Sequence, residues 1–277
     1  MIYKRIKPHP ALHEFVKEFM FLYIRHDKDS EQLVKVLPPS PENGIEFLPL
    51  AQATFINQHT GKIFKETKTI LFGQPVSQTK FIMPGEDYLV IRVIFKPGGL
   101  YRLLGGISQN ELTDKIVDAE GVIANDFRIV NEQLANAATY AEMIEITEKY
   151  LFSKISRTKI DAHPVDRIGN LLLDNSIPFS LDWLASQACL SSRQLNRKFT
   201  ERMGVGPKLF SRIVRFNKAF LYREMNPQAD WNTIAFNFGY TDYQHLYKEF
   251  KEFAGLTPNM LMMENDYAPE KILSLDT

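Results

Sequence analysis

Two segments in the C-terminal part of this 277-residue chain repeat one another. Residues 184–191 (LASQACLS) match residues 234–241 (IAFNFGYT) at an offset of 50. The offset then becomes 51, and the matched pairs are Leu195 with Leu246, Phe199 with Phe250, Gly204 with Gly255, and Pro207 with Pro258. Each copy has the pattern of a short helix, a turn and a second helix that opens on Ser or Thr. The sequence therefore predicts one helix-turn-helix written twice.

The first copy carries clear signals for where its helices begin. Ser180 is the expected N-cap of its first helix, and Ser191 is the expected N-cap of its second. Leu195 and Phe199, four residues apart, predict the buried stripe of that second helix. Another face of the same helix carries Arg193, Asn196, Arg197 and Thr200.

A helix of this kind can enter the major groove of DNA, and its side chains suit that task. Arg can donate two hydrogen bonds to guanine O6 and N7, and Asn can bond adenine N6 and N7. The polar face from Arg193 to Thr200 is thus a candidate for base reading. The alternative is an exposed polar face without a partner.

The stretch between the two copies predicts a long amphipathic helix. Gly204 is expected to end the preceding helix in a left-handed conformation, and Pro207 to start the next one. Two recognition helices that enter successive major grooves must lie about 34 Å apart, so a stiff spacer is useful. The apolar residues of this spacer are Leu209, Phe210, Ile213, Val214, Phe216, Phe220 and Leu221.

In the second copy, Asp230 is the expected N-cap of the first helix and Thr241 that of the second. The predicted inward residues are Leu246, Phe250 and Phe253. Gln244 can read adenine, Lys248 can reach a base or a phosphate, and Asp242 would repel a phosphate. We therefore expect the first copy to bind more strongly. The outward candidates are Asp242, Tyr243, Gln244, His245 and Lys248.

The formal net charge is zero, yet basic residues are concentrated in one region. Residues 190–223 hold nine Lys and Arg side chains against a single acid, Glu201. Such a run is often a solvated helix face. Its overlap with the first helix-turn-helix favours DNA, because phosphate neutralisation supplies much of a DNA-binding protein's affinity.

Length and pattern predict a multidomain α+β protein. Runs such as Gly44–Leu48, Thr69–Phe72 and Leu89–Phe95 read as strands. Helical spacing appears in 138–152 and 165–173, with a polar linker at 154–164. We expect a strand-rich mixed N-terminal domain at 1–158, serving as sensor or dimerisation domain. An all-α domain with two helix-turn-helix motifs and a long linker helix follows at 159–262, and a poorly ordered tail at 263–277.

Several other classes of protein fit poorly. The lone Cys189 excludes internal disulfides and a Cys-rich zinc site, and its position predicts a small buried side chain. The N-terminus lacks an apolar signal core, and the apolar run at 88–95 is interrupted by Arg92, so we expect no membrane span and a cytoplasmic protein. The lone cysteine also cannot supply the reactive thiols of a DNA-repair enzyme with this motif.

Several histidines and glutamates are candidates for an enzyme's active site. A cupin-type metal site would need a cluster of ligands, but no His-x-His or His/Glu pattern accompanies the candidates. Glu42 and Glu46 lack a visible nucleophile or base, and the paired glycines at 98–99 and 105–106 lack a phosphate-loop context. We therefore expect no catalytic residues, no metal, no cofactor and no enzyme activity. The histidines considered are His9, His13, His26 and His59.

The C-terminal hundred residues resemble the DNA-binding domain of the AraC/XylS family of bacterial transcription regulators. The resemblance rests on both repeats, on the closing segment 254–258 (AGLTP) and on the linker segment 210–219 (FSRIVRFNKA). Tyr240 and Leu246 stand where Phe is usual. The resemblance also implies contacts from Arg215, for which an ion pair inside the domain is an equal alternative. By alignment the base-facing positions are Arg193, Asn196 and Arg197 in the first copy, and Gln244, His245 and Lys248 in the second.

The N-terminal half is similar, more loosely, to the regulatory domain of one branch of these regulators, through 95–105 (FKPGGLYRLLG) and 111–114 (ELTD). Such domains bind effectors, dimerise or do both. The implied partners are double-stranded DNA, with RNA polymerase, a small-molecule effector and a second copy of the chain as further candidates. A constitutive regulator without effector, and a metal-dependent enzyme tethered to DNA, stay open as alternatives. Aromatic residues that could line a pocket, or simply form core, are Phe19, Phe21, Tyr23, Phe47, Phe72 and Phe95.

Overall fold

The computed structural model describes residues 2–25, 34–50, 52, 54–65, 67–84, 87–123, 127–174 and 179–266. Its strands are β1 (Ile2–Ile6), β2 (Val16–Ile24), β3 (Val34–Leu37), β4 (Gly44–Phe47), β5 (Thr54–Asn57), β6 (Ile63–Lys65), β7 (Thr69–Phe72), β8 (Thr79–Ile82), β9 (Tyr88–Phe95) and β10 (Ile116–Asp118). Its α-helices are α1 (Gly99–Leu103), α2 (Phe127–Asn136), α3 (Tyr140–Ile155), α4 (Pro164–Asp174), α5 (Leu181–Gln187), α6 (Ser192–Met203), α7 (Pro207–Met225), α8 (Trp231–Asn237), α9 (Tyr243–Ala254) and α10 (Pro258–Asp266). Short 3₁₀ turns are η1 (Pro10–Leu12), η2 (Gln109–Glu111) and η3 (Ala119–Gly121).

The strands form two antiparallel sheets. One has six strands in the order β1-β2-β9-β4-β7-β10, and the other has four in the order β3-β8-β5-β6. β9 lies inside the larger sheet and alternates its side chains between two apolar clusters. Ile91 and Val93 join the cluster that α1, α2 and α3 cover, and Val90 joins the cluster shared with Phe55 and Phe81 of the smaller sheet. These strands and helices α1 to α3 form the N-terminal domain.

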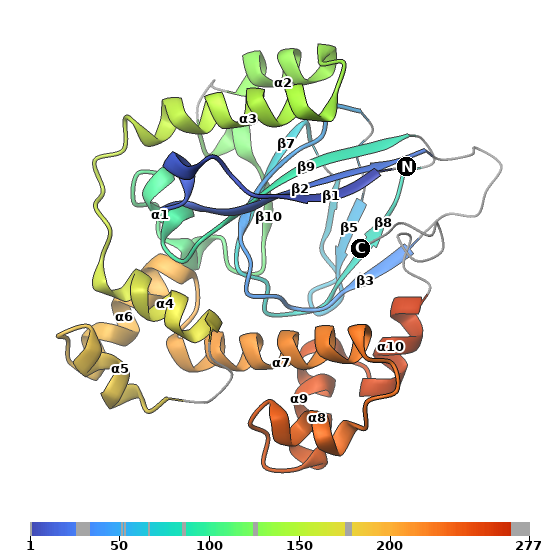
Figure 1. Cartoon of the computed structure of the whole chain (residues 1–277), viewed down its shortest axis with the longest axis vertical. Helices are drawn as coiled ribbons and strands as arrows, with labels where there is room; N and C mark the ends of the chain where they lie inside the picture. The colour runs from blue at the N-terminus through green and yellow to red at the C-terminus, as the bar shows by residue number, and fades with distance from the viewer. Residues whose placement is uncertain are drawn as a thin grey trace.

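Helices α4 to α10 form the C-terminal domain. Helix α7 is the longest of them, with 19 residues, and runs beneath the strand-rich domain with α4 to α6 at one end and α8 to α10 at the other (Figure 1). Each end has its own apolar cluster. The one around Leu195 and Phe199 contains Phe210, and the one around Leu246 and Phe250 contains Phe216.

The two domains touch along α6. Arg202 on α6 donates two hydrogen bonds of 2.6 Å to Asp166 on α4, and its guanidinium lies 4.5 Å from the ring centre of Tyr101 on α1. The Tyr101 hydroxyl donates to Glu201 at 2.8 Å. The Thr113 hydroxyl donates to the carbonyl of Gly204 at 2.7 Å. The C-terminal end of α6 is therefore held by the N-terminal domain.

The fold class predicted from the sequence is confirmed. Strands occupy all three predicted segments, as β4, β7 and β9, and the two predicted helical segments are α3 and α4. The tail predicted from residue 263 is helical as far as Asp266, where α10 ends, because Pro258 opens a further helix whose Leu261 packs on the second apolar cluster. The rest of that tail and His26 lie outside the described residues.

The candidate pocket aromatics lie mostly in the core. Phe19, Phe21, Phe47 and Phe95 are buried in the cluster beneath α2 and α3, and Tyr23 packs against it. Phe72 is half-buried, with the Arg92 guanidinium 5.1 Å from its ring centre. Arg92 itself pairs with the buried Glu46 on the neighbouring strand β4.

Within the part of the chain that the structure describes, no three His, Cys, Asp or Glu side chains gather as metal ligands would. His9 accepts a hydrogen bond from the backbone of Ala11, and His13 bonds the carbonyl of Pro8. Glu42 lies 3.5 Å from Lys17. None of the described helices has the length and apolar character needed to span a membrane.

Candidate DNA interface

The two helix-turn-helix units are built alike. Ser180 caps α5 by accepting from the amide of Trp183, and Asp230 caps α8 by accepting from Asn232 and Thr233. The second helix of each unit, α6 or α9, has 12 residues. Both end on a left-handed glycine, Gly204 with φ 90° and Gly255 with φ 65°. The predicted caps Ser180, Asp230 and Gly204 are therefore confirmed.

The turns inside the two units also match. The amide of Leu190 donates to the carbonyl of Ala185 at 3.0 Å, and the equivalent Tyr240 amide donates to Ala235 at 2.9 Å. The residue before each is left-handed, Cys189 with φ 54° and Gly239 with φ 72°. The prediction that Cys189 is buried was wrong, since its side chain is exposed. Cys189 occupies the left-handed position of the turn, which turns its side chain outward. Its alignment with Gly239 was the sequence signal for that position, because glycine adopts a positive φ most readily.

Helix α6 begins with a capping box. The Ser191 hydroxyl accepts from the amide of Gln194, whose side chain in turn accepts from the amide of Ser191. Gln194 is thereby occupied. Leu195 and Phe199 are fully buried, as the spacing predicted.

The remaining face of α6 is open. Arg193, Asn196 and Arg197 are exposed, and Thr200 is half-buried with its hydroxyl donating to the carbonyl of Asn196 at 2.9 Å. Among the described residues, the guanidinium groups of Arg193 and Arg197 have no hydrogen-bond or ion-pair partner. The four predicted residues thus lie together on one helix, with both arginines available to a ligand.

Helix α9 begins one residue later than predicted. Its N-cap is Asp242, whose carboxylate accepts from the amide of His245 at 2.7 Å, and Thr241 is not the cap. The slip of one residue in the repeat moves the start of this helix relative to α6, and a carboxylate also suits the positive end of a helix. Asp242 is therefore part of the helix end, which accounts for an acid on this surface.

The outward side of α9 is less basic than that of α6. Gln244 and Lys248 are exposed, and within the described segments neither makes a hydrogen bond or an ion pair. His245 is half-buried, packs edge-on against the ring of Tyr240, and lies 3.4 Å from Arg215. Tyr243, another outward candidate, packs against the second apolar cluster.

Arg215 has a full set of partners. It donates to Glu249 at 2.7 and 3.2 Å and to the carbonyl of Gly239 at 3.2 Å, and it lies 4.2 Å from the ring centre of Tyr240. It is 9% exposed, and Glu249 is 2% exposed. The structure therefore places Arg215 in the internal ion pair that the sequence left as an alternative. Burial, together with Glu249, raises the pKa of the Tyr240 hydroxyl, which keeps it neutral beside this pair.

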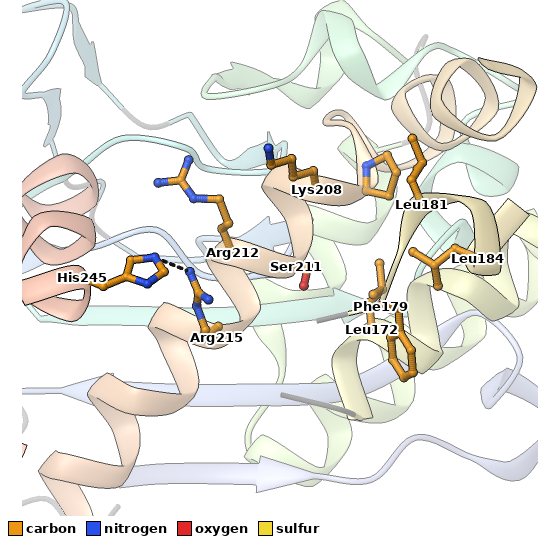
Figure 2. Close-up of a pocket in the computed structure, with 10 residues that line it drawn as sticks. Leu172, Phe179, Leu181, Leu184, Lys208, Ser211, Arg212, Arg215 and His245 are labelled. Atoms are coloured by element: carbon orange, nitrogen blue, oxygen red, sulfur yellow. Dashed lines mark hydrogen bonds between the residues drawn. The ribbon is translucent and has the colours of Figure 1, made fainter. Parts of the chain in front are cut away.

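A cavity of 590 Å³ separates the two units on one side of α7. Figure 2 shows Leu181 and Leu184 on its α5 side, and His245 facing Arg215 across from them. Arg212 also lines it, but is engaged by Glu249 at 2.8 Å and Glu252 at 2.5 Å. These two carboxylates raise the pKa of Arg212, Glu252 being the stronger cause. The exposed cation of this cavity is Lys208.

Two known families match separate parts of this chain. A helix-turn-helix domain family of the AraC type matches residues 184–263, the span of both units. The C-terminal domain is therefore an AraC-type helix-turn-helix domain. This AraC-type protein is a DNA-binding transcription regulator with an N-terminal regulatory domain. Residues 4–118 of the N-terminal domain match a family described as a domain of unknown function, DUF6597.

Solved structures with a similar fold include ToxT from Vibrio cholerae. One ToxT structure has a TM-score of 0.50 at 12% identity and covers 89% of this chain and 99% of that one. A second, bound to (E)-4-(8-methylnaphthalen-1-yl)but-3-enoic acid, has a TM-score of 0.51 at 12% identity and covers 90% and 100%. The AraC-type protein thus shares its two-domain fold with ToxT. No curated protein matches its sequence.

Proposed function

We propose that this regulator reads two successive major-groove segments of double-stranded DNA, one with α6 and one with α9. Arg193, Asn196 and Arg197 read the first segment, and Gln244 and Lys248 read the second. The observation that carries this proposal is that these side chains are exposed on two matched helices, while other basic residues nearby are held in ion pairs. Arg and Lys suit guanine, and Asn and Gln suit adenine.

The remaining predicted positions take supporting roles in this proposal. The Thr200 hydroxyl already donates to the carbonyl of Asn196 on the same helix, so it can offer DNA only an oxygen acceptor. Arg215 and His245 hold the second unit in shape, because Arg215 is buried against Glu249 and His245 packs on Tyr240. Lys208, exposed on α7 between the units, neutralises phosphate.

The first reading face is tested with Arg197→Ala in the full-length protein, on DNA selected by the wild type. The loss of a bidentate contact should weaken binding by about 1–3 kcal/mol and relax the preference at one base position. Lys198→Ala is the matched control, because Lys198 neighbours Arg197 on α6 but pairs with Glu201 at 3.0 Å. Unchanged affinity and preference in Arg197→Ala at fixed salt would refute the assignment.

We further propose that a small molecule or a partner protein acts on the N-terminal domain of this cytoplasmic protein. One ToxT structure of the same fold holds an aromatic carboxylic acid, so organic acids form the first set to screen. A ligand at 100 times its dissociation constant should stabilise the protein by about 2.7 kcal/mol, which a thermal-shift assay detects. Metal analysis of the purified protein tests the enzyme alternative, and the absence of any stabilising acid favours constitutive regulation.

A further inference from the structure

The loop between β7 and β8, residues 73–78, belongs to the N-terminal domain but contacts both helix-turn-helix units. Its Val76 packs against the apolar cluster of the first unit and also against that of the second. Among the described residues, Val76 shares this position with Leu209 of α7 alone. The N-terminal domain therefore places an apolar side chain where the two units meet.

The same loop reaches the C-terminal caps of both recognition helices. A methyl group built on Gly204, which ends α6, would lie 3.3 Å from Cβ of Gln74 and 2.7 Å from Oγ1 of Thr113. One built on Gly255, which ends α9, would lie 3.1 Å from Oε1 of Gln78. Gln74 and Gln78, at the two ends of a five-residue stretch, thus touch the ends of α6 and α9.

The middle of the loop is bound by the carboxylate of Asp114. Asp114 accepts hydrogen bonds from the amides of Val76 and Ser77 at 3.0 Å each, from the Ser77 hydroxyl at 2.5 Å and from Asn57 at 2.9 Å. Asp114 itself is left-handed, with φ 57°. This set of contacts fixes Val76 relative to the sheets, so the contact with the two units is made by a rigid element.

We propose that the 73–78 loop is a positioning element that sets the placement of α6 relative to α9, and so the spacing of the two DNA segments that the protein accepts. This inference rests on the proposed two-segment reading. Helix α7 is the covalent link between the units, and each unit packs on it through its own apolar cluster. The 73–78 loop adds a second connection, because it contacts the ends of both α6 and α9. Rigid coupling of two binding units raises their combined affinity.

The placement is measured without DNA. Spin labels are attached to the exposed native Cys189 in the first unit and to Asn237→Cys, an exposed site in the second. The distance distribution between them should be narrow in the otherwise unchanged chain and clearly broader in Val76→Ala and in Asp114→Asn. Val76→Ile, which keeps the apolar contact, should restore the narrow distribution. Val117→Ala is the control, because Val117 is a half-buried valine of β10 that packs on the cluster beneath α2 and α3.

The consequence for DNA is measured on sites selected by the wild type. Val76→Ala should bind a two-segment site about tenfold more weakly, bind each single segment as the wild type does, and tolerate altered spacing better. A distance distribution as narrow in Val76→Ala as in the wild type, with the fold intact, overturns the positioning role. The two proposals can also fail separately. If Val76→Ala broadens the distribution but the wild type prefers no two-segment site, the positioning role is supported and the proposed two-segment reading is overturned.

Discussion

Arg215 of the linker helix and Glu249 of the second recognition helix form a two-bonded ion pair in the interior of the C-terminal domain. Arg212 also reaches Glu249, at 2.8 Å. One carboxylate therefore ties α9 to two consecutive turns of α7. The exposed face of α9 is positioned by this buried contact as much as by its apolar stripe.

Removal of that carboxylate should be costly. Glu249→Ala leaves the Arg215 guanidinium buried without its counter-charge, and the loss of one partner of a buried pair costs about 3–5 kcal/mol. Urea unfolding of the full chain measures the change. Glu132→Ala is the control, since its pair with Arg128 lies on the surface and is worth about 1 kcal/mol or less. Equal effects of the two substitutions would show that the internal pair has no special role.

The start of α9 offers a second test. Asp242→Ala removes the carboxylate that accepts from the amide of His245 and should destabilise the protein by about 1 kcal/mol. Thr241→Ala should change stability much less, because Thr241 does not cap the helix. Chemical denaturation of both variants compares them directly. A larger loss in Thr241→Ala would restore the cap predicted from the sequence.

Salt dependence tests the role of Lys208. A cation that neutralises one phosphate releases counterions, so Lys208→Ala should make the slope of log K against log salt shallower by about 0.9. Affinity should fall alike for all DNA sequences, because phosphate contacts carry no sequence information. Lys149→Ala on α3, where Lys149 pairs with Glu145, serves as control. A slope equal to that of the wild type places Lys208 away from the DNA.

The Asp114 carboxylate predicts a pH effect. Burial alone would raise its pKa, but hydrogen bonds from Ser77, Val76 and Asn57 outweigh burial and hold the pKa below its usual value. A carboxyl group with a lower pKa in the folded state stabilises the protein above its unfolded pKa, near 3.9, and this contribution is lost as the pH falls through the folded value. The stability difference between the wild type and Asp114→Asn should therefore shrink on acidification from pH 6 to about 3. A difference that is constant over this range would contradict the account.

Local signals predicted much of the C-terminal domain. Ser180, Ser191, Asp230 and Gly204 stand where the helices begin and end, because capping depends on residues within one turn of each end. The spacing of Leu195 and Phe199 was likewise enough to predict the buried face of α6. Leu221 was the exception on α7, since it is 41% exposed although its neighbours Phe216 and Phe220 are buried.

The charge pattern predicted less well, because partners from distant segments decide what each cation does. Of the nine basic residues in 190–223, six are engaged within the protein: Lys198 with Glu201, Arg202 with Asp166, Arg212 and Arg215 with Glu249, Lys218 with the Asp174 carbonyl, and Arg223 with the carbonyls of Pro227 and Ala229. Arg193, Arg197 and Lys208 remain exposed. The sequence shows how many basic residues this region has, but only the tertiary structure shows which of them are exposed and unpaired.

The contact of the 73–78 loop with both units was also beyond sequence reasoning. Val76 follows Pro75 in a stretch that reads as an ordinary turn, and its role depends on the docking of two domains. Nothing within a few residues of Val76 encodes that docking. Thr113 and Asp114 were noted in the sequence for the resemblance of their segment to a regulatory domain, and their contacts with Gly204 and with this loop appear only in the structure.

Selection of bound sites from random DNA by the full-length protein tests the central claim most directly. The account predicts a site with two preferred segments, their centres about one turn of DNA or 10–10.5 base pairs apart. Preference in one segment should relax in Arg197→Ala and preference in the other should relax in Lys248→Ala. A single preferred segment, or loss of preference at the same bases in both variants, would contradict two-segment reading.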